Sequence, residues 1–389
     1  MTDEISRKST SSDVSLSESE LLAIEYELNL STTSANIPRQ PRSFYRPIPK
    51  SYQWYQLIMP LLPDSRYLYF FRVTKNQYKY ILEELIGTND RQLQYGNVSI
   101  EKKLHMYLYF VGNNPYVVEF DDRFAISNPM KFVRIVADVI TTHLYSKFVK
   151  WLSAFDKVRI KSQFEEFSGF KNIIGTVDGT HIQIIAQGKY KAGYISRKCI
   201  YAINATFVCD YDLKILFASI GCPGSYHDNK VWEYTPIFNS PEAYFTGLDI
   251  ILGDTAYSET KFLVAPYKAV KRSEREKADF NYWHSRARVR AEHLIGYLKS
   301  KWKLLGTIIR VKDLTNKVLL IKSVVPVQNM LIDYNRRNCL PLEQIVDIDD
   351  DFESDLNIVR NLPQHMALGG HRASRVAANR KDLMRTQKI

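Results

Sequence analysis

The chain has 389 residues, 45% of them hydrophobic, which is enough for two domains with a substantial core. Its formal net charge of +11 favours a polyanionic partner. No apolar run approaches the roughly 20 residues that cross a bilayer, which argues against a membrane protein. The four cysteines lack a CxxC pair, which predicts reduced thiols of an intracellular protein and excludes a zinc site or disulfide framework.

Residues 1–42 are rich in serine and threonine and are predicted to be a disordered segment, with one short docking helix at 21–30. Residues 43–150 follow, and their pattern is helical. A first helix is predicted between a capping box at Thr74–Gln77 and a stop at Gly87, and a second between a cap at Ser99 and a stop at Gly112. A short helix at 116–124 follows, and Ser127 is predicted to cap a long helix after it. This order is that of a helix-turn-helix DNA-binding unit, and a purely structural helical domain fits it about as well.

The period changes to that of strands after residue 173. Four strands are expected, at 173–185, 200–210, 215–222 and 248–254. Apolar runs in the first and the last of these end on Asp178 and Asp254, so both acids are expected at the ends of adjacent central strands. A Pro-Gly turn between the third and fourth strands leads into a helix start.

The run 285–302 reads as a helix with one apolar stripe, and Glu292 is its carboxylate. At about 100° per residue, Arg288, Glu292 and Lys299 share a line beside that stripe. An ordinary helix with paired surface charges would look the same. Three converging carboxylates, Asp178, Asp254 and Glu292, would repel one another unless Mg²⁺ or Mn²⁺ neutralised them, and a pair of such ions can clamp the oxygens of a phosphodiester.

The region 262–310 is densely basic, and because it brackets Glu292 it is interpreted as a phosphate-binding flank rather than a solvated face. A last helix is expected at about 314–334, packed beneath the sheet. The predicted domains are a helical, helix-turn-helix-like domain at 43–150, a catalytic domain at 151–340 and a flexible charged tail at 341–389.

Five motifs in order resemble the catalytic domain of PIF/Harbinger-type DDE transposases and their domesticated nuclease relatives. They are Asp178-Gly179-Thr180-His181, then Arg197-Lys198 with Asn204 and Val208-Cys209-Asp210, then Pro223 to Asp228, Gly253 to Tyr257, and Arg288 to Lys299. The resemblance implies an RNase H-like α/β fold, a mixed five-stranded sheet flanked by helices, and covers roughly residues 44–340.

Carried over by position, Asp178, Asp254 and Glu292 match the catalytic triad, and Asp228 matches an additional metal-ligand position. Asp228 could equally be a helix cap after its turn. Arg288 and Lys299 match positions that would hold DNA phosphate, as would the Arg197–Lys198 pair. The sequence departs from the family pattern at Ser196, Cys199, Ile295 and residues 327–329. None of these positions is an acid, so the departures affect packing and DNA contacts rather than the catalytic chemistry.

The resemblance therefore implies a nuclear, Mg²⁺- or Mn²⁺-dependent DNA endonuclease and strand transferase acting on mobile-element DNA. The alternative is a domesticated DNA- or chromatin-binding protein that kept the fold without transposition; all four acids are present, which favours the enzyme. A separate Myb/SANT-like DNA-binding partner is expected, which would also assist import from the cytoplasm, and the prediction leaves room for a homo-oligomer.

Overall fold

A computed structural model of the chain describes residues 54–185, 191–268 and 275–341. The predictions of a disordered segment at 1–42, a docking helix at 21–30 and a charged tail after residue 341 fall outside these residues.

The region before the sheet is helical, as predicted. Its elements are η1 (Trp54–Ile58), η2 (Met59–Leu61), α2 (Asp64–Phe71), α3 (Lys75–Ile86), η3 (Arg91–Gln94), α4 (Ile100–Asn113), α5 (Val117–Phe124), α6 (Met130–Val139), η4 (Ile140–Leu144) and α7 (Tyr145–Phe148). The capping box before α3 is confirmed: the Gln77 amide N–H donates to Thr74 Oγ1 (3.2 Å), and the Thr74 N–H donates to Gln77 Oε1 (2.9 Å). The α3 stop at Gly87 and the Ser99 cap of α4 are also confirmed.

Two predicted helix boundaries in this region are wrong. Ser127 does not cap the long helix, because Asn128 adopts the left-handed conformation (φ 59°) and α6 begins only after Pro129. Helix α4 passes Gly112 and ends at Asn113, where left-handed Asn114 (φ 47°) stops it. In both places an asparagine next to the predicted boundary adopts the left-handed conformation, which asparagine tolerates better than most residues.

The sheet has five strands and is mixed, as expected. The strands are β1 (Ile173–Gln183), β2 (Ala202–Cys209), β3 (Ile215–Pro223), β4 (Ile250–Leu252) and β5 (Leu263–Val264), in the order β3-β2-β1-β4-β5. β1, β2 and β3 pair antiparallel, whereas β4 runs parallel to β1 and β5 parallel to β4. Every residue of β2 is buried, because helices cover both faces of the sheet.

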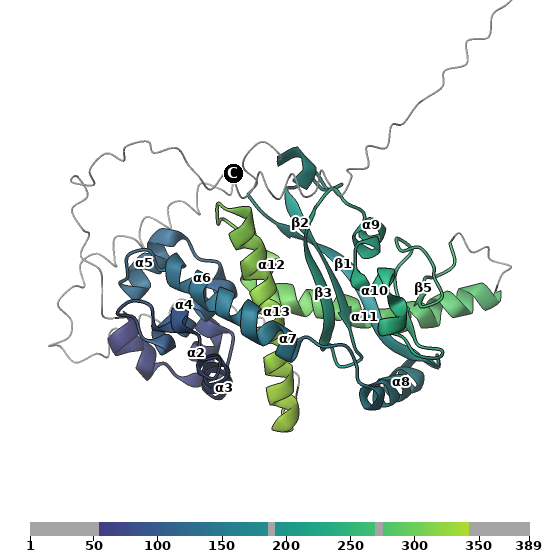
Figure 1. Cartoon of the computed structure of the whole chain (residues 1–389), viewed down its shortest axis with the longest axis horizontal. Coiled ribbons are helices and arrows are strands. Elements are labelled where there is room, and N and C mark those ends of the chain that lie inside the picture. The colour runs from purple at the N-terminus through teal and green to yellow at the C-terminus, as the bar shows by residue number, and fades with distance from the viewer. Residues whose placement is uncertain (1–53, 186–190, 269–274, 342–389) are drawn as a thin grey trace, which may run out of the picture. The chain divides into compact units, whose positions relative to one another are not determined.

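The remaining elements are α8 (Ala154–Ser168), η5 (Lys191–Tyr194), α9 (Asp228–Glu233), α10 (Pro236–Asn239), η6 (Pro241–Ala243), α11 (Arg275–Lys301), α12 (Lys303–Gly306) and α13 (Leu314–Arg337). α11 crosses one face of the sheet and α9 and α10 lie on the other (Figure 1). α11 begins ten residues before the predicted start, and α13 continues through Pro326 to Arg337. The sequence interpretation did not locate α8.

α13 ties the helical region to the sheet. Asn329 in its middle bonds to both backbone groups of Ile215 in β3 and donates to the carbonyl of Phe148 at the end of α7. Ser323, two turns earlier, accepts a hydrogen bond from the Tyr107 hydroxyl of α4 (2.9 Å). The helical region and the sheet therefore share one hydrophobic core. The predicted boundary at residue 150 stays a prediction.

Within the described ranges, no helix is both long enough and apolar enough to pass through a lipid bilayer.

Candidate active site

Asp178 and Asp254 are brought together by the parallel pairing of β1 and β4. Asp254 follows β4 by two residues, whereas Asp178 lies within β1 and not at a strand end as predicted. Thr176 pairs with Leu252, so the same register two residues later places Asp178 next to Asp254. Neighbouring strands are about 4.8 Å apart. Asp178 Oδ1 accepts from the N–H of Gly179 (2.9 Å), and Asp254 Oδ1 accepts from that of Ala256 (2.9 Å). Each carboxylate keeps its second oxygen for another partner.

Asp228 approaches β1 from the other face of the sheet. Consecutive side chains of a strand point to opposite faces, so Asp178 faces α11 and residue 179 faces α9. Gly179 has no side chain, and a Cβ built there would lie 2.3 Å from Asp228 Oδ1. The same oxygen accepts from Asn204 Nδ2 of β2 (3.0 Å). His227 occupies the cap position of α9, so Asp228 does not cap that helix as the alternative interpretation suggested.

Glu292 is linked to Asp178 by Arg288, which forms an ion pair with each of them. On α11, Arg288 contacts Asp178 Oδ2 with one guanidinium nitrogen (3.7 Å), and its other terminal nitrogen donates to Glu292 Oε1. The Arg288 side chain is 17% exposed and that of Glu292 is 48% exposed. Arg288, predicted to hold DNA phosphate, thus forms ion pairs with two of the three predicted catalytic acids.

The acids influence one another electrostatically. Burial raises the pKa of Asp178 to about 6; Arg288 and the Gly179 N–H oppose this rise, and the charges of Asp254 and Asp228 add to it. Burial also raises the pKa of Tyr257, and the charges of Asp228, Asp178 and Asp254 raise it further. The charges of the three aspartates therefore act on the buried Tyr257 hydroxyl group, and those of Asp254 and Asp228 act on Asp178.

The acidic side chains offer the type of ligand atom that a divalent cation prefers. Asp178, Asp254, Asp228 and Glu292 offer only oxygen, which Mg²⁺ and Mn²⁺ prefer. Gly179 leaves open the space that the Asp228 carboxylate fills. Among the described residues, no three acidic, histidine or cysteine side chains already form a closed metal site. Asp178 and Asp254 would hold the ion, and Glu292 would join them by exchanging Arg288 for the metal.

The raised pKa of Asp178 predicts how stability depends on pH. The folded carboxyl group binds its proton below about pH 6, whereas the ordinary pKa of an aspartate in an unfolded chain is 3.8. The stabilisation is thus complete below pH 3.8 and is lost as the pH rises through 6, at most about 3 kcal/mol. We expect Asp178→Asn to unfold at a higher temperature than wild type at pH 7.5 in EDTA, and at the same temperature at pH 4. Calorimetry at both pH values would measure this; no gain at pH 7.5 would contradict it.

Basic side chains gather beside Asp228. Lys299 of α11 donates to the backbone carbonyl of His181 on β1 (3.0 Å). Burial and the charge of Lys198 lower the pKa of Lys299, so the two predicted phosphate-binding lysines lie near each other. Arg197 donates to the ring of His227, directly before Asp228. Lys299, Lys198 and Arg197 therefore lie toward His181 and His227, whereas Arg288 lies against Asp178 and Glu292.

This basic cluster, Lys299, Lys198 and Arg197, predicts a change in the salt dependence of DNA binding. Each lysine that contacts one phosphate of duplex DNA contributes about 0.9 to the slope of log affinity against log salt. We expect Lys299→Ala and Lys198→Ala each to weaken binding to all duplex sequences and to lower the slope by roughly that amount. Lys171→Ala removes an exposed lysine that pairs with Glu165 and serves as the control. If the salt slopes of the Lys299→Ala and Lys198→Ala variants equal that of the control, these lysines are merely solvent-exposed and do not contact DNA phosphate.

Two residues near the acids were not predicted as site residues. Asn204 holds Asp228, and Tyr257 carries the hydroxyl group on which the charges of the aspartates act. The available signal was the polar pair Asn204 and Thr206, spaced by two in an otherwise apolar strand. Both are fully buried and lie opposite His181 and Gly179 in the register.

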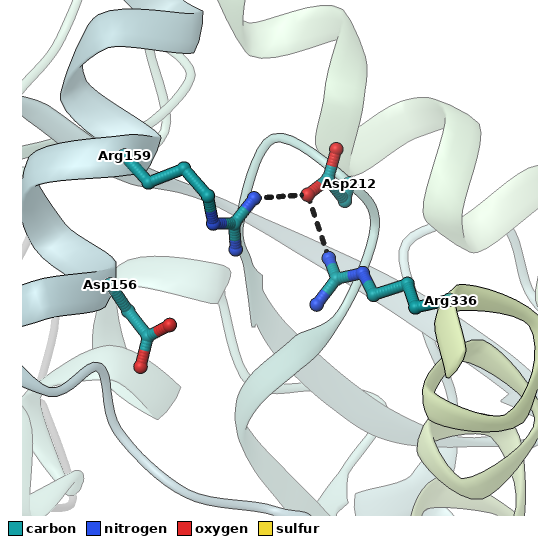
Figure 2. A pocket seen from close by; sticks show the side chains of 4 residues that line it. All are labelled: Asp156, Arg159, Asp212 and Arg336. Carbon is teal, nitrogen blue, oxygen red and sulfur yellow. Dashed lines mark hydrogen bonds and ion pairs between the residues drawn. The ribbon is translucent and has the colours of Figure 1, made fainter. Parts of the chain in front are cut away.

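A second charged group surrounds a surface hollow of about 530 Å³ away from these acids. Figure 2 shows Arg159 of α8 and Arg336 of α13 meeting at Asp212, with Asp156 apart from them. Both arginines bond to Asp212 Oδ2 (2.6 and 2.7 Å), and Arg336 also lies 3.5 Å from Asp210 Oδ2. Since two cations meet two carboxylates, this group joins α8, the β2–β3 turn and α13 without excess charge.

Comparison of the sequence with known proteins finds a family and several relatives. Residues 177–325 match the family described as DDE superfamily endonuclease. The chain is 25% identical over 218 residues to the Arabidopsis thaliana protein named "Protein ALP1-like", covering 52% of each chain. It is 26% identical over 195 residues to the human protein named "Putative nuclease HARBI1", covering 49% of this chain and 56% of that protein.

The chain thus spans about half of the length of these relatives. No solved structure matches it significantly. The matched segment begins one residue before Asp178 and contains Asp228, Asp254 and Glu292. The resemblance expected from the five sequence motifs is confirmed: residues 177–325 match the DDE superfamily endonuclease family.

Proposed function

We propose that the chain is a metal-dependent DNA endonuclease that cuts mobile-element DNA and joins the freed ends by phosphoryl transfer. The observation that carries the proposal is the parallel pairing of β1 and β4, whose register sets Asp178, in the middle of β1, beside Asp254, two residues after β4. The match of the surrounding residues to an endonuclease family supports it.

Each group of site residues has its own role in the proposed reaction. Asp178 and Asp254 would hold the cation, Mg²⁺ or Mn²⁺, and Asn204 holds Asp228 by a hydrogen bond. A bound divalent cation would neutralise the acids and draw charge from the phosphodiester that is cut. The basic cluster (Lys299, Lys198 and Arg197) binds phosphates of the flanking DNA, and Glu292 completes the acid set when Arg288 releases it.

A second candidate function is a domesticated DNA- or chromatin-binding protein without transposition. One observation favours it: Arg288 pairs with Asp178 and Glu292 and so balances part of the acid charge itself. A site that keeps this arrangement on DNA would bind without cutting.

The cleavage test uses DNA that flanks the chain's own gene, incubated with the full chain in Mg²⁺ or in EDTA. The proposal predicts nicks or breaks in Mg²⁺ only, and joined products when target DNA is added. Cutting without joining would limit the activity to an endonuclease. Binding with no cutting, with a DNA-binding partner protein supplied, would establish the second function.

We also propose that a separate Myb/SANT-like protein selects the DNA ends and accompanies the chain into the nucleus. The chain's helix-turn-helix candidate supports this, because its long helix α6 buries Phe132, Val133 and Val136, and Lys131 at its start bonds to the Tyr95 hydroxyl. Tight, sequence-specific binding of element ends by the purified chain alone would refute the need for a partner.

A further inference from the structure

α11 carries a glycine on its exposed surface at position 296. Glycine is among the least favourable residues inside a helix, so a helical glycine calls for a reason. Packing provides none: a Cβ added to Gly296 meets no described atom within 4 Å, and its φ is not in the left-handed region. Gly306, just after α11, shows the contrast, since a Cβ there would lie 2.3 Å from the Lys299 carbonyl oxygen.

The residues on either side of Gly296 are those of the site. Glu292 lies one turn before it, with its side chain 48% exposed. Lys299 lies about one turn after it and is the lysine that neighbours Lys198. Along the helix axis, Glu292 and Lys299 are about 10 Å apart at 1.5 Å per residue. That length corresponds to about three nucleotides of one DNA strand.

We infer that one DNA strand crosses α11 at Gly296, with its sugar–phosphate backbone against the helix between Glu292 and Lys299. This inference rests on the proposed function, because it places the substrate of that reaction. The missing side chain lets the strand approach the helix closely. The Lys299 ammonium group then binds a phosphate on one side, and the phosphodiester to be cut lies toward Glu292 on the other.

The test compares Gly296→Ala, Gly296→Leu and Gly306→Ala in the full chain. Alanine and leucine are strong helix formers, so both changes at 296 should raise the unfolding temperature, by roughly 2–4 °C for alanine. The same alanine should weaken binding to a duplex from the flank of the chain's own gene roughly tenfold, by steric conflict at the contact. Leucine should weaken it further, and Mg²⁺-dependent cleavage should fall with binding. Gly306→Ala should lower the unfolding temperature, which identifies a glycine needed for packing.

The outcomes separate this inference from the proposed function. Wild type that neither binds nor cuts DNA overturns both. Wild type that binds and cuts, with both 296 variants equal to it, overturns the inference alone. A lower unfolding temperature for Gly296→Ala would show that the chain's own packing requires this glycine and would also overturn it. A more stable variant with weaker DNA binding is the result that we expect.

Discussion

Asp254→Asn is expected to abolish Mg²⁺-dependent DNA cleavage while the protein stays folded. The substitution keeps the size of the side chain and the acceptor for the Ala256 N–H, but it removes the charge beside Asp178. Without that charge, a cation is held less tightly and the phosphodiester loses its electrostatic support. The expected loss in cleavage rate is roughly a thousandfold or more. Single-turnover cleavage of a labelled duplex at saturating protein would measure it.

DNA affinity should stay constant or rise slightly, because one carboxylate fewer repels the phosphates. Asp279→Asn is the matched control, since it makes the same change on an exposed residue of α11 that pairs only loosely with Arg275 (3.9 Å). Glu292→Gln should behave like Asp254→Asn if Glu292 exchanges Arg288 for the cation. Cleavage by Asp254→Asn at the wild-type rate would remove this residue from the mechanism.

Asp249→Asn is expected to cost the largest stability of any substitution considered, about 3–5 kcal/mol of unfolding free energy. Asp249 directly precedes β4, is 1% exposed, and lies between Lys157 (2.8 Å) and Lys161 (2.5 Å) of α8. Thr246 also donates to it through its N–H (2.8 Å). Asparagine would leave two lysines facing a neutral group in a buried position. Urea unfolding at pH 7 would give the difference.

The pKa of Asp249 fixes the pH range of this effect. Burial alone would raise the pKa, but the hydrogen bonds from Lys157, Lys161 and Thr246 lower it to about 2, from 3.8. The carboxylate's stabilisation is therefore present above pH 3.8 and is lost as the pH falls toward 2. The difference between wild type and Asp249→Asn should shrink over that range. Glu165→Gln, in an exposed pair with Lys171, should cost less than about 0.5 kcal/mol. Equal costs for the two variants at pH 7 would contradict the account.

Asp249 also matters to the site, because the residues that follow it lead through β4 to Asp254. A weakened ion pair at the start of β4 would loosen the pairing that sets Asp254 beside Asp178. Cleavage by Asp249→Asn should therefore decline at temperatures below its unfolding midpoint.

Local signals explain what could be predicted from the sequence. The Thr74 capping box needs only residues three apart, and it formed as predicted. The apolar runs that end on Asp178 and Asp254 marked two strands, and their parallel pairing brought the two acids together. Asp178 nevertheless lies within β1 and not at its end, because β1 continues to Gln183 in its pairing with β2. β5 has two residues, Leu263 and Val264, too few to show an alternating pattern.

What the sequence could not predict depends on contacts between distant segments. Arg288 was expected to face DNA because it shares a helix line with Lys299; its pairing with Asp178 depends on how α11 crosses β1. The Lys157–Asp249 pair joins α8, which the periodicity did not reveal, to the start of β4. The hydrogen bond from Asn204 to Asp228 could not be predicted either, because it depends on how the turn before α9 places Asp228 against β2.

The central claim is that Asp178 and Asp254 bind a divalent cation together, and Fe²⁺-directed cleavage of the polypeptide tests it most directly. Fe²⁺ in place of Mg²⁺, with ascorbate and peroxide, produces radicals that cut the backbone next to the bound ion, and mass spectrometry locates the cuts. The account predicts cuts near residues 178, 228 and 254, suppressed by excess Mg²⁺ and absent in Asp178→Asn. Cuts confined to other segments, or cuts at these positions that persist in Asp178→Asn, would contradict it.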